Sequence, residues 1–87
     1  MIIMRDISLL ENSKNITTDK EAELALNTFH AYSNFLKDSF LTTGKKNELY
    51  LLINSWFNDF LQNQSEGFIN RKKDIISETK VFLSILA

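Results

Sequence analysis

The sequence predicts an all-α protein, an antiparallel up-down bundle of four helices with a short first helix. Apolar residues recur every three or four positions along most of the chain, which places them on one face of a helix. The chain contains no proline, and its two glycines are Gly44 and Gly67, so few residues would interrupt long helices. Short links between such helices favour antiparallel neighbours. The alternative is a three-helix core with a loosely attached N-terminal segment.

Length and composition predict one domain that spans residues 1–87. A chain of this size buries one modest core, and its 44% hydrophobic and 24% charged residues are typical of a globular protein. The absence of cysteine excludes a disulfide scaffold and a thiolate metal site. No apolar stretch approaches the roughly 18 residues of a membrane span, and the first residues do not resemble a secretory signal. We therefore expect a cytoplasmic protein.

The first helix is predicted over about residues 3–12, and it is too short to be stable without packing against the others. The second helix is predicted over about residues 19–41. Its start is marked by a capping box, because Glu21 follows Thr18 at the spacing that satisfies two free N–H groups. Its end is marked by Gly44, which suits the left-handed position after a helix.

The second helix carries apolar residues on two faces. The predicted core face comprises Ala22, Ala25, Leu26, Phe29, Tyr32, Leu36 and Phe40. Leu24, Ala31 and Phe35 lie nearly opposite, by roughly 180° on a wheel of 3.6 residues per turn. This helix therefore offers more apolar surface than one neighbour requires.

The third helix, predicted over about residues 46–63 with Asn47 as a possible cap, is the expected centre of the core. Its apolar residues occupy positions 49, 52, 53, 56, 57, 60 and 61, an arc of roughly 180° with Tyr50. Trp56 lies in the middle of this stripe beside Phe57 and Phe60. Aromatic rings bury the largest areas, so we expect Trp56 in the core.

The final helix is predicted over about residues 68–86. The polar segment before it ends at Gly67, unless Ser65 caps a helix that includes this glycine in its first turn. The core face is predicted to hold Phe68, Ile69, Lys72, Ile75, Ile76, Thr79, Phe82, Leu83 and Leu86. Val81 and Ile85 lie off that face, so the last two turns are apolar nearly all round, as in helices that are buried or meet a partner.

The chain offers little that could support catalysis. His30 is the only histidine and lies on a polar arc, so we expect a solvated side chain with nothing to orient it. Two carboxylate pairs, Asp19 with Glu23 and Asp74 with Glu78, have the spacing of one helical turn that could hold a cation. Such pairs are usually solvated surface groups. We therefore expect no enzyme, no metal site, no cofactor and no small-molecule substrate.

Nucleic-acid binding is the competing hypothesis, because basic residues cluster at positions 45–46 and 71–73. The net charge is −1, however, and a bundle would place the two clusters towards opposite ends. A helix-turn-helix around residues 44–47 would expose Glu48 and Asp59 on its reading helix, and neither can bind phosphate. Arg71 also precedes Asp74 by nearly one turn, which suggests a surface ion pair. We expect no nucleic-acid partner.

The surplus apolar surface is the feature that points to function. The candidate interface residues are Leu24, Ala31 and Phe35 on the second helix, Leu51 on the third, and Val81 and Ile85 on the last. Monomers rarely expose large contiguous apolar patches, and small chains often gain stability by forming oligomers. The alternative is that the second helix is simply central, with neighbours on two sides.

From these observations we expect a non-catalytic protein-interaction module whose partner is another protein, a second copy of the chain, or both. The expected role is a regulator or inhibitor that neutralises a partner protein, as immunity proteins, antitoxins and phage-encoded inhibitors do. No motif ties the chain to any of those families. The competing hypotheses are a nucleic-acid-binding transcriptional regulator and a structural subunit of a larger assembly.

Overall fold

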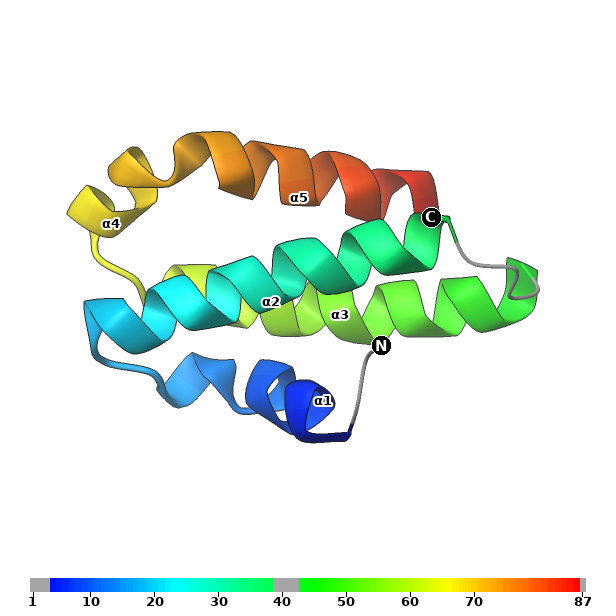
Figure 1. Cartoon of the computed structure of the whole chain (residues 1–87), viewed down its shortest axis with the longest axis horizontal. Helices are drawn as coiled ribbons and strands as arrows, with labels where there is room; N and C mark the ends of the chain where they lie inside the picture. The colour runs from blue at the N-terminus through cyan, green and yellow to red at the C-terminus, as the bar shows by residue number, and fades with distance from the viewer. Residues whose placement is uncertain (1–3, 39–42, 87) are drawn as a thin grey trace.

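The helices form where the apolar spacing predicts them. The computed structural model describes residues 4–38 and 43–86, with side chains for residues 7–38 and 44–85. The elements are α1 (Met4–Glu11), the short 3-10 helix η1 (Ser13–Asn15), α2 (Asp19–Lys37), α3 (Thr43–Gln62), α4 (Glu66–Arg71) and α5 (Lys73–Leu86). Along the chain α1, α2, α3 and α5 alternate in direction (Figure 1). The all-α up-down bundle is confirmed, with the last predicted helix divided in two.

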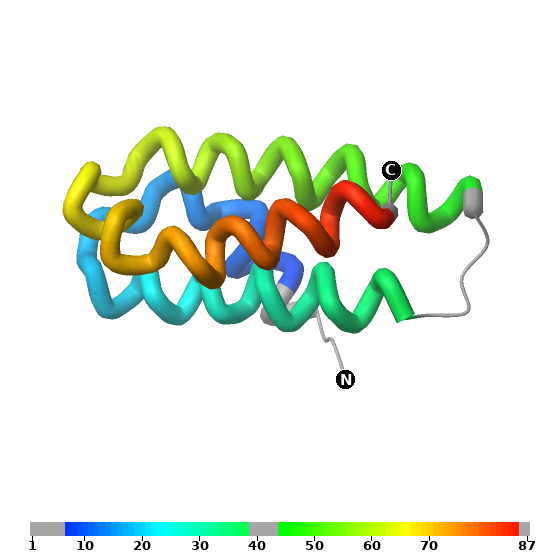
Figure 2. The backbone as a smooth tube through the Cα atoms, turned by 90° about the horizontal axis from the view of Figure 1, so that it is seen from above, coloured from blue at the N-terminus to red at the C-terminus, as the bar shows by residue number. Residues whose placement is uncertain are grey.

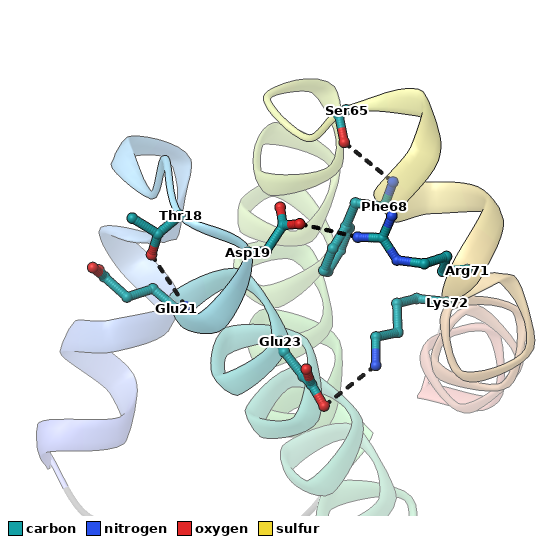
Figure 3. A network of polar contacts seen from close by, with 8 residues as sticks. All are labelled: Thr18, Asp19, Glu21, Glu23, Ser65, Phe68, Arg71 and Lys72. Atoms are coloured by element: carbon teal, nitrogen blue, oxygen red, sulfur yellow. Dashed lines mark hydrogen bonds and ion pairs between the residues drawn. The ribbon is translucent and has the colours of Figure 1, made fainter.

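Hydroxyl side chains cap the N-termini of two helices at the same end of the bundle (Figure 3). At the start of α2, Thr18 Oγ1 accepts a hydrogen bond from the backbone N–H of Glu21 at 3.3 Å. At the start of α4, Ser65 Oγ accepts one from the N–H of Phe68 at 3.1 Å. Each cap satisfies an N–H group that has no partner inside its helix. The start of α2 at Thr18 and the alternative start at Ser65 are thus confirmed, whereas of the two bonds of the predicted capping box only the one to Thr18 Oγ1 is present.

The helices lie in three layers (Figure 1). The middle layer holds α2 and α3, with α5 packed on one side of this layer and α1 on the other. Seen from above, α2 and α3 lie along opposite edges of the molecule and α5 lies between them (Figure 2). The most extensive packing joins α2 to α5, and these two helices run parallel although they are far apart in the sequence. η1 packs against α3, where the side-chain amide of Asn63 donates to the carbonyl of Lys14 at 2.7 Å.

Aromatic rings occupy the centre of one continuous core. The ring of Phe29 in α2 lies 4.9 Å from that of Phe57 and 5.6 Å from that of Phe60 in α3, and Phe60 meets Phe68 of α4 edge-on. Leu10 of α1 is fully buried in the same cluster, so α1 belongs to the bundle. The buried apolar residues are Leu10, Ile16, Ala22, Ala25, Leu26, Phe29, Tyr32, Leu36, Ile53, Phe57, Phe60, Phe68, Ile76 and Leu83.

The apolar arc of α3 is wider than its neighbours cover, which corrects two predictions. Trp56 is only partly buried and packs against the core from its edge. Leu52, also predicted on the core face, is 50% exposed. Phe57 and Phe60 are the fully buried rings of this helix. An arc of roughly 180° contains more residues than the contact with α1, α2 and α5 can bury, so those at its margins remain in water.

The predicted end of the second helix and the predicted start of the third were wrong, and the break within the last helix was not predicted. α2 ends at Lys37 rather than Leu41, and Asp38 is its C-cap. A carboxylate at the C-terminal end of a helix interacts unfavourably with the helix dipole. Residues 39–42, including Phe40 of the predicted core face, lie outside the described residues. Gly44 lies in the first turn of α3 without a positive φ, so it does not close α2. Lys72 separates α4 from α5 with φ −110° and ψ 15°. No proline or glycine causes this break, and tertiary contacts at Phe68 and Arg71 accompany it.

Candidate interaction surface on α2

The helix period gives α2 one buried side and one solvent-facing side. Phe29 and Leu26 lie on the buried side. At 100° per residue, a residue five positions away lies roughly 140° around the helix and one nine positions away lies roughly 180° around it. Leu24 is five positions from Phe29, and Ala31 and Phe35 are five and nine positions from Leu26. Leu24, Thr28, Ala31 and Phe35 follow one another at spacings of four, three and four, so they form a stripe on a single face. We call this stripe the outer face of α2.

The outer face is apolar and solvent-accessible. Leu24 is 58% exposed and Phe35 is 52% exposed, and Ala31 between them is also exposed. The hydroxyl of Thr28 donates to the backbone carbonyl of Leu24 at 2.8 Å, so it is satisfied within the helix. α2 lies along an edge of the molecule (Figure 2), and the exposure of these side chains leaves the stripe accessible to another helix. All three candidate residues predicted on this helix share the one face.

The other candidate residues lie on different helices. Leu51 is 61% exposed on α3, the helix at the opposite edge of the molecule from α2 (Figure 2). Val81 and Ile85 are 55% and 60% exposed and lie one turn apart on α5. Leu52 of α3 is similarly exposed. It was not a candidate because its spacing along the chain places it on the predicted core face. Only α2 carries a stripe of three candidates.

A hollow marks the N-terminal part of the solvent-facing side of α2. It is open to solvent, and its lining residues are Lys20, Glu21, Glu23, Leu24 and Asn27. All five residues belong to α2, and Leu24 supplies the apolar side chain. Nothing in the sequence spacing predicts the hollow, because it depends on the side-chain conformations.

A row of charges joins α2 to the last two helices. The guanidinium of Arg71 contacts the carboxylate of Asp19 at 3.0 Å, and the ammonium of Lys72 contacts that of Glu23 at 3.3 Å (Figure 3). The local pair predicted between Arg71 and Asp74 is therefore wrong, because Arg71 reaches across to α2. The basic cluster that suggested nucleic-acid binding has two of its three side chains facing carboxylates.

His30 is not the solvated residue that the sequence predicted. Its side chain is 26% exposed, its Nε2 contacts Glu78 Oε1 at 2.5 Å, and its ring lies 5.2 Å from that of Phe82. Lys37 places its ammonium 5.1 Å from the centre of the same Phe82 ring, within the range of a cation–π contact. These contacts continue the row of charges and hold the far halves of α2 and α5 together. Together with the ion pairs of Arg71 and Lys72, these contacts form a structural interface between α2 and the last helices, which we call the seam.

The predicted carboxylate pairs do not assemble a cation site. Asp19, Glu23 and Glu78 each face a basic side chain. Within residues 4–38 and 43–86, no three histidine, cysteine, aspartate or glutamate side chains gather in a way that could hold a metal ion.

Burial raises the pKa of the Tyr32 phenol above its ordinary value of 10.0. Among the described helices, none is long and apolar enough to cross a membrane.

Comparison with known proteins identifies no relative. No protein-family description matches the chain, and neither the curated proteins nor the solved structures contain a significant match.

Proposed function

We propose that this chain is a non-catalytic protein-interaction module that binds through the outer face of α2. Its expected role is a regulator or inhibitor in the cytoplasm that neutralises a partner protein. The observation that carries the proposal is the stripe of Leu24, Ala31 and Phe35, which remains in water although the chain has a complete core of its own. Exposed apolar stripes of this kind are typical of surfaces that meet another helix or a groove.

Two features of the charge distribution favour this proposal over a nucleic-acid-binding regulator. Arg71 and Lys72 face the carboxylates of Asp19 and Glu23, so binding phosphate would first have to break these ion pairs. The net charge of −1 gives no general attraction to a polyanion. A protein surface with an apolar stripe and polar margins fits the outer face better than a nucleic-acid backbone does.

Phe35→Asp tests the proposal, with Leu51→Asp as the matched control. Both substitutions put a carboxylate at an exposed apolar position in a helix, since Phe35 is 52% and Leu51 is 61% exposed. We expect both variants to keep the helix content of the parent by circular dichroism and to melt within about 8 °C of it. Only Phe35→Asp should lose the proteins that the tagged parent retains from a lysate of its source organism. Aromatic anchors contribute much of the binding energy at interfaces, which is why the loss should be selective.

The design separates binding from folding. A folded Phe35→Asp variant that retains the same proteins as the parent, in the same amounts, would refute the assignment of the outer face. Equal losses in both aspartate variants would refute it as well, because the binding surface would then not be confined to α2. Unfolding of Phe35→Asp would contradict the exposure on which the proposal rests.

A further inference from the structure

Lys20 and Asp38, which have opposite charges, flank the two ends of the outer face. Asp38 follows Lys20 by 18 residues, which is five turns at 3.6 residues per turn, so both side chains lie at the same angle around α2. Both residues are exposed. Lys20 makes no ion pair within the described part of the chain, whereas Asp38 contacts Lys37 at 3.2 Å and leaves 72% of its side chain in water. A carboxylate can accept a second donor.

We propose that the partner of the outer face is a second copy of this chain, paired antiparallel along α2 about a two-fold axis. The proposal rests on the proposed function and names its partner. A two-fold axis makes an interface from one surface used twice, so each residue must find its mate on the same surface. The outer face meets this requirement along its whole length.

One register satisfies every part of the face. An antiparallel arrangement that sets Leu24 opposite Phe35 of the second copy also sets Thr28 opposite Ala31, because both pairs of numbers add to the same value. Lys20 then meets Asp38 with an offset of one residue, or about 1.5 Å along the helix, which the long lysine side chain covers. The small residues fall at the centre, where the two helices approach most closely, and the bulky ones fall at the ends.

The hollow on α2 gives the aromatic ring a place to dock. Phe35 is 52% exposed at one end of the outer face, and the hollow lined by Lys20, Glu21, Glu23, Leu24 and Asn27 lies at the other end. The two-fold axis brings each Phe35 to the hollow of the second copy. Its ring would thus contact Leu24 and the aliphatic stem of Lys20, and the ammonium of that lysine would reach Asp38.

Neighbouring charges leave Lys20 available for this contact. The carboxylate of Asp19, the residue before it, is engaged by Arg71, and that of Glu23, three positions after it, is engaged by Lys72. Glu21, the residue after it, lies roughly 100° away around the helix. A contact limited to one helix from each copy is small by the standard of stable complexes, so the dimer should be weak, with a Kd on the order of 100 µM. Salt should weaken it further, because the ion pairs are at the margin of the contact.

Charge exchange between Lys20 and Asp38 tests the pairing by sedimentation velocity over about 10 µM to 1 mM protein at low salt. Lys20→Glu and Asp38→Lys each place like charges together twice in a two-fold dimer, and each should raise the Kd about tenfold. A one-to-one mixture of the two variants restores both ion pairs in a mixed dimer. It should therefore associate as the parent does, although neither variant associates well alone.

The fold should tolerate both changes. Lys20→Glu adds an acidic residue near the start of α2 and Asp38→Lys adds a basic one at its end, and both suit the helix dipole. Phe35→Asp should abolish dimerisation, whereas Leu51→Asp should leave it unchanged. A parent that remains monomeric at about 1 mM, or a mixture that associates no better than its components, overturns the antiparallel pairing. If Phe35→Asp still loses a partner from the lysate, the proposed function stands and only the second copy is refuted.

Discussion

Phe29 and Phe35 offer a direct test of the division of α2 into two faces. They are the same residue type in the same helix, six positions apart, and they differ in environment. Phe29 is fully buried against the rings of Phe57 and Phe60, whereas Phe35 is 52% exposed. Replacing each by alanine should thus change the free energy of unfolding by very different amounts.

The expected magnitudes follow from burial. A buried phenylalanine replaced by alanine costs about 3–5 kcal/mol, because the loss of transfer energy is joined by a cavity. A domain of 87 residues has a total stability of roughly 4–13 kcal/mol, so Phe29→Ala should melt at least about 12 °C below the parent or fail to fold. Phe35→Ala loses about 1 kcal/mol of partial burial and regains about 0.5 kcal/mol from the higher helix propensity of alanine. Its melting temperature should remain within about 5 °C of the parent.

Urea unfolding followed by circular dichroism and by Trp56 fluorescence would measure both changes, and coincidence of the two signals would justify a two-state treatment. Protein at about 5 µM keeps any pairing of copies from adding to the apparent stability. Phe29→Leu serves as a milder variant if Phe29→Ala does not fold. The two-face description of α2 is refuted if Phe35→Ala costs as much as the change at Phe29.

Substitutions at Ser65 and Tyr32 test the start of α4 and the burial of the Tyr32 phenol. Ser65→Ala removes the oxygen that accepts the N–H of Phe68, so the free energy of unfolding should fall by about 0.5–2 kcal/mol; urea titration would show it, and Ser65→Asp should recover most of the loss. Because burial raises the pKa of Tyr32, the folded state holds this proton more tightly than the unfolded state. The resulting stability is present below about pH 10 and is lost as the pH rises through the higher folded pKa. Urea midpoints at about pH 8 and about pH 11 should differ more in the parent than in Tyr32→Phe, and equal differences would contradict the burial.

Local signals predicted most of the secondary structure and part of the candidate surface. Thr18 and Ser65 were recognisable as caps because each hydroxyl oxygen accepts a hydrogen bond from the backbone N–H three residues later. The same short-range regularity separated Phe29 from Phe35 on α2. It failed for Leu52, which has core spacing and remains half exposed, because spacing gives the direction of a side chain and not what lies opposite.

The sequence by itself determined most of the helical segments and which residues of α2 share the stripe of Leu24, Ala31 and Phe35, since both depend on 3.6 residues per turn within one element. Only the tertiary structure decided which charges meet. Arg71 finds Asp19 across 52 positions and His30 finds Glu78 across 48, because α2 and α5 lie side by side and parallel. Short links predict the direction of consecutive helices, but packing of the whole core selects which helices touch. The seam between α2 and α5, and the exposure of the opposite side of α2, follow from that selection.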